Sequence, residues 1–333
     1  MPVPSRLGFE DLNAALKAAG EETRLRILAL LAEAELTVSD LTDILRQSQP
    51  RISRHLKLLA EAGLVARFRE GAWAFFRLAE HGEAADVAHA LIERLDPADP
   101  VIARDRERLA EVRAARAAAA QAYFRAHAAE WDRIRRLHVA DEAVEAAIGQ
   151  ALTERPFRSL LDLGTGTGRM LELFGPGLER GLGVDLSLDM LALARARLDR
   201  AGLRHCSVRQ GDIYDLALPR DSFDVVLIHQ VLHFLDDGAR AIREAARVLR
   251  PQGRLLVVDF APHDLEFLRE EHAHRRLGFA PETVTQWMEA AGLTGVQHHS
   301  LPPEPGSDGK ITVSLWLAHD PRMVVAAPQR EVA

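Results

Sequence analysis

From about residue 158 onward, short continuous apolar runs alternate with segments whose apolar residues recur every three or four positions. Continuous apolar runs are typical of strands buried on both faces, and the longer spacing is typical of amphipathic helices. The predicted strands are 159–163, 181–185, 205–210, 223–228 and 254–259, and the predicted helices lie near 168–174, 188–201 and 238–249. Strands that alternate with helices predict an α/β fold with a doubly wound parallel sheet.

The pattern changes toward the end of this region. Residues 251–253, Pro-Gln-Gly, predict a turn before the fifth strand, and a further helix is expected over 281–291. Two more strands are predicted at 294–300 and 310–318, on either side of a loop rich in proline, glycine and serine at 302–309. Seven strands are therefore expected, and the last two form an antiparallel hairpin.

The first hundred residues show helical spacing before a β pattern. Phe9, Leu12 and Leu16 form the stripe of a first helix, and a second helix is expected from about residue 21 to 34. Two shorter helices follow, and each buries one apolar triplet: Leu41, Ile44 and Leu45 in the first, and Ile52, Leu56 and Leu59 in the second.

A tight turn joins the two shorter helices. It begins at residues 46–47, Ser48 is placed to cap the second helix, and Pro50 is tolerated in a first turn. Apolar residues at 64–69 and 73–78 then predict two strands with a short connection. This order predicts a winged helix-turn-helix, an α+β module whose second helix reads DNA.

The second short helix turns a polar face away from its apolar triplet. That face carries Gln49, Arg51, Ser53, Arg54 and Lys57, and the wing adds Arg67, Arg69 and Arg77. Residues 45–78 hold seven lysines and arginines against two glutamates, a net charge of +5 in a chain whose net charge is −7. Positive charge on both helix and wing favours double-stranded DNA as the partner, over a winged helix used for protein contacts.

Four segments, LTVSDL at 36–41, QPRISRHLKLL at 49–59, AGLV at 62–65 and REGAWAFFRL at 69–78, share one family pattern. Over roughly residues 5–95 the chain resembles the ArsR/SmtB winged-helix repressors. Members that sense metals carry a Cys-Val-Cys-like run where this chain has Thr37 and Ser39. Hydroxyl groups are poor ligands for soft metals, so thiol-based metal sensing is not expected and no metal site is predicted.

The resemblance also implies a homodimer, because the family dimerises through its terminal helices. A strongly apolar helix after the wing carries Ala84, Val87, Ala88, Leu91, Ile92 and Leu95, and the stripe of the first helix can join it. Two-fold symmetry matches a palindromic operator, which favours the dimer. The alternative is that both helices simply complete the core of a monomer.

Residues 160–168 read Leu-Leu-Asp-Leu-Gly-Thr-Gly-Thr-Gly and carry the main chemical signal. Three glycines at alternate positions, Gly164, Gly166 and Gly168, let the backbone turn sharply and approach a ligand closely. Asp185 ends the next predicted strand, where an acid can take two ribose hydroxyls. A dinucleotide fingerprint would need a further glycine, and Arg169 stands in its place.

This spacing resembles the class I S-adenosylmethionine (AdoMet) methyltransferases. The resemblance implies AdoMet or S-adenosylhomocysteine as ligand, with a role for each motif residue. Asp162 and the glycine turn lie at the methionine portion, Asp185 and Leu186 at the ribose, Asp212 and Ile213 at the adenine, and His229 and Gln230 face the same crevice. The alternative is a nucleotide-type fold that binds nothing.

The histidines allow two interpretations. His229 and His233 are weak candidates for a general base, and lining the pocket or capping a helix is the alternative role. His272 and His274 are expected on the solvated surface of a helix, because side chains at i and i+2 point apart. Cys206 is the only cysteine, so the chain lacks paired thiols for arsenite methylation and the Pro-Cys pair of cytosine-C5 chemistry. No Asp/Asn-Pro-Pro-Tyr/Phe motif for methylating base amines is present.

Between the two predicted modules lies a connector. Pro97 and Pro100 break the chain, and residues 101–122 are rich in alanine and arginine, which predicts an exposed helical spacer. Tyr123 and Trp131 follow it and are candidates to stack on a sulfonium-bearing ligand. Ordinary aromatic packing is the alternative for both.

These observations predict a winged-helix domain over 1–96, a helical connector over 97–140, a methyltransferase-like domain over 141–320 and a flexible tail over 321–333. No run approaches a membrane span and no signal peptide is evident, so a cytoplasmic protein is expected. The favoured function is a transcriptional regulator that senses AdoMet or its product. The alternatives are an active small-molecule methyltransferase with an autoregulatory DNA-binding domain, and an enzyme that methylates DNA-bound or ribosomal targets.

Overall fold

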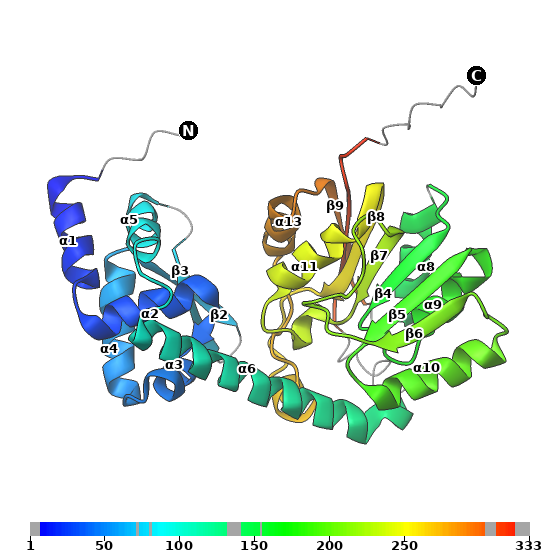
Figure 1. The fold of residues 1–333 in the computed structure, drawn as a ribbon, viewed down its shortest axis with the longest axis horizontal. Coiled ribbons are helices and arrows are strands. Elements are labelled where there is room, and N and C mark those ends of the chain that lie inside the picture. The colour runs from blue at the N-terminus through cyan, green and yellow to red at the C-terminus, as the bar shows by residue number, and fades with distance from the viewer. Residues whose placement is uncertain are drawn as a thin grey trace. The chain divides into compact units, whose positions relative to one another are not determined.

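The computed structural model describes residues 7–70, 73–79, 82–131, 141–153, 155–303 and 311–323 (Figure 1). The chain divides into two compact units, residues 1–119 and 120–333, and each is described by itself. The tip of the predicted wing, most of the loop at 302–309, the end of the connector and the tail from residue 324 lie outside the described residues.

The amino-terminal unit has the predicted winged helix-turn-helix. Its elements are α1 (Phe9–Ala19), α2 (Glu22–Glu33), β1 (Leu36–Thr37), α3 (Val38–Leu45), α4 (Gln49–Glu61), β2 (Val65–Glu70), β3 (Trp73–Leu78) and α5 (Glu83–Ile92). The sheet has the order β1-β3-β2, and its first strand was not predicted. The apolar triplets of α3 and α4 are buried as expected.

Local chemistry sets the ends of the two short helices. At the start of α3, the Asp40 amide donates to the Thr37 hydroxyl at 3.2 Å, and the Thr37 amide donates to the Asp40 carboxylate at 2.9 Å. This reciprocal capping box satisfies amides that the helix leaves unpaired. Arg46 ends α3 in the left-handed region, and Ser48 occupies the capping position of α4 without a side-chain cap bond.

A long helix, α6 (Pro100–His127), corrects the prediction of an exposed spacer over residues 101–122. In its first half Leu109 and Asp105 are buried, and Asp105 is only 2% exposed. Arg26 on α2 holds Asp105 through two hydrogen bonds of 2.7 Å. Ile102 and Leu109, seven positions apart, are both buried, but the prediction gave too little weight to this sparse apolar stripe among the alanines and arginines, and the ion pair with Arg26 leaves no pattern in the sequence.

The carboxy-terminal unit contains the seven predicted strands. They are β4 (Ser159–Leu163), β5 (Arg180–Asp185), β6 (Cys206–Gln210), β7 (Phe223–His229), β8 (Leu249–Phe260), β9 (Thr294–Leu301) and β10 (Val313–His319). They form one sheet in the order β6-β5-β4-β7-β8-β10-β9. The first five pair in parallel, and β10 is antiparallel to both β8 and β9, which confirms the predicted closing hairpin.

Helices cover both faces of this sheet (Figure 1). One face packs against α8 (Asp141–Thr153), α9 (Arg169–Phe174) and α10 (Leu188–Arg200), and the other against α11 (Gly238–Arg247) and α13 (Pro281–Ala290). Strand order reverses at β4, so the carboxyl ends of β4, β5 and β7 border the crevice where doubly wound sheets bind ligands.

One local prediction in this unit was wrong. The turn expected at 251–253 lies inside β8, which begins at Leu249. Phe223 pairs with Leu249, but Val225 pairs with Arg254, so the register shifts and extra residues bulge from β8. Gln252 takes a positive φ of 65° within this irregular segment. The pairing of β7 with β8 therefore starts at Leu249, before Pro251, the residue that suggested a break.

Candidate cofactor pocket and DNA-reading surface

The glycine turn after β4 adopts a backbone that side chains rarely allow. Gly164, Gly166 and Gly168 have φ values of 69°, 51° and 80°. A Cβ atom on Gly164 would stand 2.4 Å from Cγ2 of Val231, and one on Gly168 would stand 3.0 Å from Cβ of Ala194. The turn is therefore held tightly between the segment after β7 and helix α10.

Two carboxylates organise the turn. Asp162 in β4 is buried and accepts a hydrogen bond of 2.6 Å from the hydroxyl of Thr165. Asp185, at the end of β5, accepts from the amide of Gly166 at 2.8 Å and from the amide of Ser187 at 2.8 Å. Burial raises the pKa of Asp185, and the backbone amides oppose that rise. Asp185 thus ties the turn of one strand to the turn of the next.

The remaining residues expected around a nucleoside occupy different environments. Leu186 is 41% exposed beside Asp185, as a residue facing a ligand would be. Asp212 is exposed and accepts from the amide of Tyr214 at 2.9 Å, whereas Ile213 is buried in the core between the sheet and α11. An open glycine turn, a fixed carboxylate and an exposed leucine at adjacent strand ends fit an adenosyl ligand.

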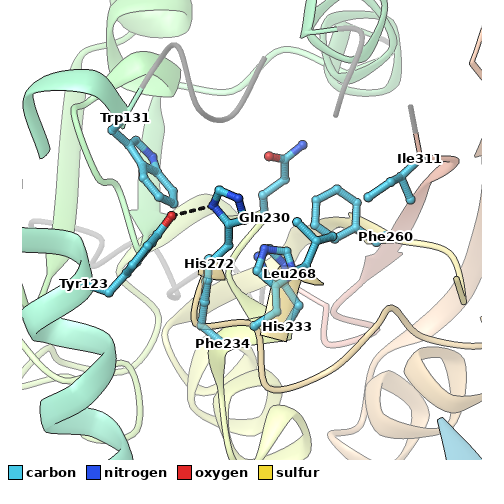
Figure 2. A pocket seen from close by; sticks show the side chains of 10 residues that line it. Tyr123, Trp131, Gln230, His233, Phe234, Phe260, Leu268, His272 and Ile311 are labelled. Carbon is cyan, nitrogen blue, oxygen red and sulfur yellow. Dashed lines mark hydrogen bonds between the residues drawn. The ribbon is translucent and has the colours of Figure 1, made fainter. Parts of the chain in front are cut away.

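A hollow that opens to solvent lies in the same unit, and its volume is about 420 Å³ when the open space at its mouth is included (Figure 2). Its lining includes Tyr123, Trp131, Gln230, His233, Phe234, Phe260, Leu268, His272, His274 and Ile311. It approaches the glycine turn through Trp131, whose Nε1 stands 3.7 Å from the place of a Cβ on Gly166. Tyr123 and Trp131 therefore line a cavity, and Trp131 also packs edge-on against Phe124, so the predicted stacking on a ligand stays a prediction.

His233 and Asp259 form a buried pair at one wall of the hollow. Nδ1 of His233 lies 2.8 Å from Oδ1 of Asp259, which is fully buried. The Asp259 carboxylate also accepts from the amides of Phe260 at 2.8 Å and His233 at 3.3 Å. A carboxylate can only accept, so in the neutral ring the proton stands on Nδ1 and Nε2 is a hydrogen-bond acceptor.

Gln230, which the resemblance predicted to face the crevice, lines this hollow. It follows β7 with a left-handed φ of 54°, unusual for a residue with a side chain. The residue is only 7% exposed, and its Nε2 is buried without a hydrogen-bond partner among the described residues. Figure 2 shows the amide between Trp131 and Phe260. A buried amide nitrogen left without a partner is costly, so the site favours a ligand that accepts from it.

The prediction for His272 and His274 was wrong. Helix α12 (Phe267–Glu271) ends before them, and Ala273 takes a positive φ of 56° that redirects the chain. His272 Nδ1 lies 2.7 Å from the hydroxyl of Tyr123, and the His274 ring lies 4.2 Å from that of His233. Both histidines line the hollow instead of a solvated surface.

Two further histidines lie close to this site. His229, the last residue of β7, is buried and is not among the described residues that line the hollow. Burial and the neighbouring His233 lower the pKa of His263 to about 4. His263 is therefore neutral near pH 7 and adds no positive charge behind the hollow.

The predicted DNA-reading surface is open to solvent in the amino-terminal unit. Gln49, Arg51, Ser53, Arg54 and Lys57 are exposed on α4, and Arg67 and Arg69 are exposed on β2. Arg77 corrects the prediction for the wing, because it forms an ion pair of 3.6 Å with Glu35 and lies over the ring of Phe68. The wing therefore presents two arginines, both on one strand.

Known proteins match the two units of the chain separately. Residues 21–67 match the family model for the bacterial regulatory protein, arsR family, and residues 161–257 match that for a methyltransferase domain. The chain is 40% identical over 98 residues to the arsenic resistance transcriptional regulator ArsR1 of Pseudomonas putida, which covers 29% of this chain and 75% of that protein. The chain belongs to the arsR family. Its second unit is a methyltransferase domain, and the predicted resemblances are confirmed.

The methyltransferase domain of this arsR-family protein has relatives of its own. It is 36% identical over 106 residues to the uncharacterized methyltransferase YcgJ of Bacillus subtilis, which covers 32% of this chain and 42% of that protein. A crystal structure of a possible histamine N-methyltransferase from Thermotoga maritima shares the fold, with a TM-score of 0.50, 23% identity, and coverage of 61% of this chain and all of that one. The chain spans 31% to 56% of the length of the first curated relatives it matches.

The described residues form no helix that is long and apolar enough to span a bilayer. They also contain no cluster of three or more histidine, cysteine, aspartate or glutamate side chains that could hold a metal ion.

Proposed function

We propose that this arsR-family protein is a transcriptional regulator whose methyltransferase domain senses AdoMet or S-adenosylhomocysteine and thereby controls DNA binding. The exposed polar face of α4 and the two wing arginines support an operator as partner. The left-handed glycine turn and Asp185 support an adenosyl ligand.

One observation carries the regulatory part of the proposal: helix α6 belongs to both units, because the division between them falls inside it. The part of α6 that belongs to the amino-terminal unit contacts the helix-turn-helix at both ends of α3. Arg116 pairs with Asp40 in the capping box at the start of α3, and Arg108 donates to the carbonyl of Ile44 near its end at 3.1 Å. Its last turns place Tyr123 in the wall of the hollow.

A continuous helix transmits a displacement from one end to the other. A ligand that changes the position of Tyr123 or Trp131 would therefore act on the residues of α6 that hold α3. An effector shifts DNA affinity only by its differential affinity for the two states, and such couplings are typically five- to 150-fold.

The proposed regulator is a cytoplasmic homodimer. The apolar stripe on α1 supports this, because Phe9, Leu12 and Leu16 are 84%, 39% and 48% exposed and so do not complete the core of the single chain. A two-fold dimer would bury this stripe and present two reading helices to a palindromic operator.

A second function, methyl transfer to a small molecule, is favoured by the pair of His233 and Asp259. AdoMet, when bound, supplies an electrophilic methyl group, and transfer then needs alignment and sometimes a base. His233 Nε2 can accept a proton from a bound molecule, and the Asp259 carboxylate stabilises the resulting positive charge.

Titration of operator binding with each adenosyl compound tests the first function. The DNA is a duplex that the protein selects from a random pool, and fluorescence anisotropy gives its dissociation constant. We expect saturating S-adenosylhomocysteine to change that constant by about fivefold or more. The variant A118G/A119G/A120G weakens α6 between the residues that contact α3 and the turns that carry Tyr123. Both adenosyl compounds should still bind to this variant, but they should no longer change the dissociation constant for the operator.

The control variant A118Q/A119Q keeps a good helix former at exposed positions and should retain the full change. If the adenosyl compound binds and operator affinity does not move in the unaltered protein, the sensor proposal fails. Release of S-adenosylhomocysteine from AdoMet with a lysate-derived acceptor would then support the enzyme.

A further inference from the structure

We propose that the hollow lined by Tyr123, Gln230 and His233 binds a small, uncharged aromatic molecule that carries a hydroxyl group. The proposal rests on the proposed function, because it identifies a second ligand for the unit that binds the adenosyl compound. Three features of the hollow favour such a ligand: its aromatic walls, its lack of charged lining groups and its two hydrogen-bonding groups.

The walls of the hollow favour a flat apolar ligand. Phe234, Phe260 and Trp131 supply aromatic surface, and Leu268 and Ile311 supply aliphatic surface. Phe124 stands behind two of these rings, with its ring centre 4.8 Å from Phe234 and 5.2 Å from Trp131. Phe124 holds Trp131 and Phe234 through these edge-to-face contacts, so this part of the aromatic wall is already in place before a ligand binds.

The charges around the hollow favour a neutral ligand. Among the described residues that line it there is no lysine, arginine, aspartate or glutamate. The carboxylate of Asp259 behind the wall is fully buried and already accepts three hydrogen bonds. While the lining histidines are neutral, a charged ligand would lose its hydration without gaining a partner of opposite sign, which is strongly unfavourable.

Two polar groups in the hollow favour a ligand that carries a hydroxyl group. In the neutral His233 ring Nε2 is an acceptor, because Nδ1 carries the proton that faces Asp259, and Nε2 of Gln230 is a buried donor. A hydroxyl group can donate to Nε2 of His233 and accept from Nε2 of Gln230. The Tyr123 hydroxyl does not meet this need, because its hydrogen-bond partner is His272.

Calorimetry with four one-ring probes tests the proposal, in the full chain with and without saturating S-adenosylhomocysteine. The probes are phenol, toluene, benzylamine and benzoate. We expect phenol to bind about tenfold or more tightly than toluene, since two hydrogen bonds separate them, and the two charged probes to bind more weakly than phenol. Equal affinity for phenol and toluene, or tighter binding of benzylamine, overturns the proposal.

Two variants localise the effect. Gln230→Asn keeps a residue that tolerates the left-handed backbone and withdraws the amide by one methylene. His233→Phe keeps a ring and removes the acceptor. In each, the advantage of phenol over toluene should fall to about threefold or less while toluene binding is unchanged. An advantage that persists in both variants contradicts the assignment.

The binding of S-adenosylhomocysteine, measured separately in every variant, shows that the unit is folded and separates the two proposals. If it binds and phenol does not, only the assignment of the hollow fails. If phenol shows the expected pattern and neither adenosyl compound binds, the proposed function fails while the hollow keeps its ligand.

Discussion

Replacing Asp185 with alanine should weaken the binding of S-adenosylhomocysteine by about a hundredfold or more. Hydrogen bonds to a charged group contribute about 1.5–3 kcal/mol each, and the proposed pair to the ribose hydroxyls would be lost together. The same change frees the amides of Gly166 and Ser187, which Asp185 now holds at 2.8 Å. The glycine turn would then have to be ordered by the ligand itself.

Isothermal titration calorimetry measures this effect, with Asp199→Ala on α10 as a control that should leave the affinity unchanged. Because burial raises the pKa of Asp185, its carboxylate takes up a proton at a higher pH than an exposed aspartate does. Affinity in the unaltered protein should therefore fall as the pH is lowered toward that raised pKa, and the alanine variant should lose this dependence. An unchanged isotherm for the alanine variant contradicts the ribose assignment.

The parallel sheet was predictable because each strand is a continuous apolar run between helical segments. The predicted boundaries of β4 to β7 agree with the structure to within one residue. The pair of short helices was equally predictable, because each must bury its triplet on one side. In both cases the information is local, and the sheet order then follows from the rules for βαβ connections.

The hollow was not predictable in the same way, because its residues come together only in the folded unit. His233 and Asp259 are 26 positions apart, and Tyr123 and His272 are 149 apart. The environment of His274 depends on the positive φ of Ala273, and nothing in the sequence indicates that this alanine adopts such a conformation. Gln230 was noticed as a residue at a strand end, but its buried amide is a property of the packing around it.

The docking of α6 was missed for a related reason. Alanine and arginine usually indicate an exposed helix, and here the arginines instead find carboxylates and helix ends on the amino-terminal unit. Arg113 donates to the carbonyl of Glu33 at 3.0 Å, and Arg106 pairs with the side chain of the same residue. The docked face does carry a short apolar stripe of Ile102, Leu109 and Val112, but alanine and arginine outnumber it, and charge pairing across long sequence separations adds nothing to it.

Replacing Arg26 with alanine should therefore destabilise the amino-terminal unit by about 3–5 kcal/mol. The change leaves the Asp105 carboxylate buried without its bidentate partner, and breaking such a pair from one side is costly. The loss should detach the first half of α6 from α2. Urea-dependent hydrogen exchange, followed in peptides from α2 and α6, measures the free energy of unfolding for this unit.

A double variant separates the charge effect from the packing. Arg26→Met with Asp105→Leu removes both charges and keeps comparable volume, so it should be close to the unaltered protein in stability. Lys57→Ala, which breaks an exposed ion pair of 3.7 Å with Glu61, should cost less than about 1 kcal/mol. If Arg26→Ala costs no more than Lys57→Ala, α6 is not held to α2 by this pair. The link that carries the regulatory proposal would then lose its anchor on the DNA-reading unit.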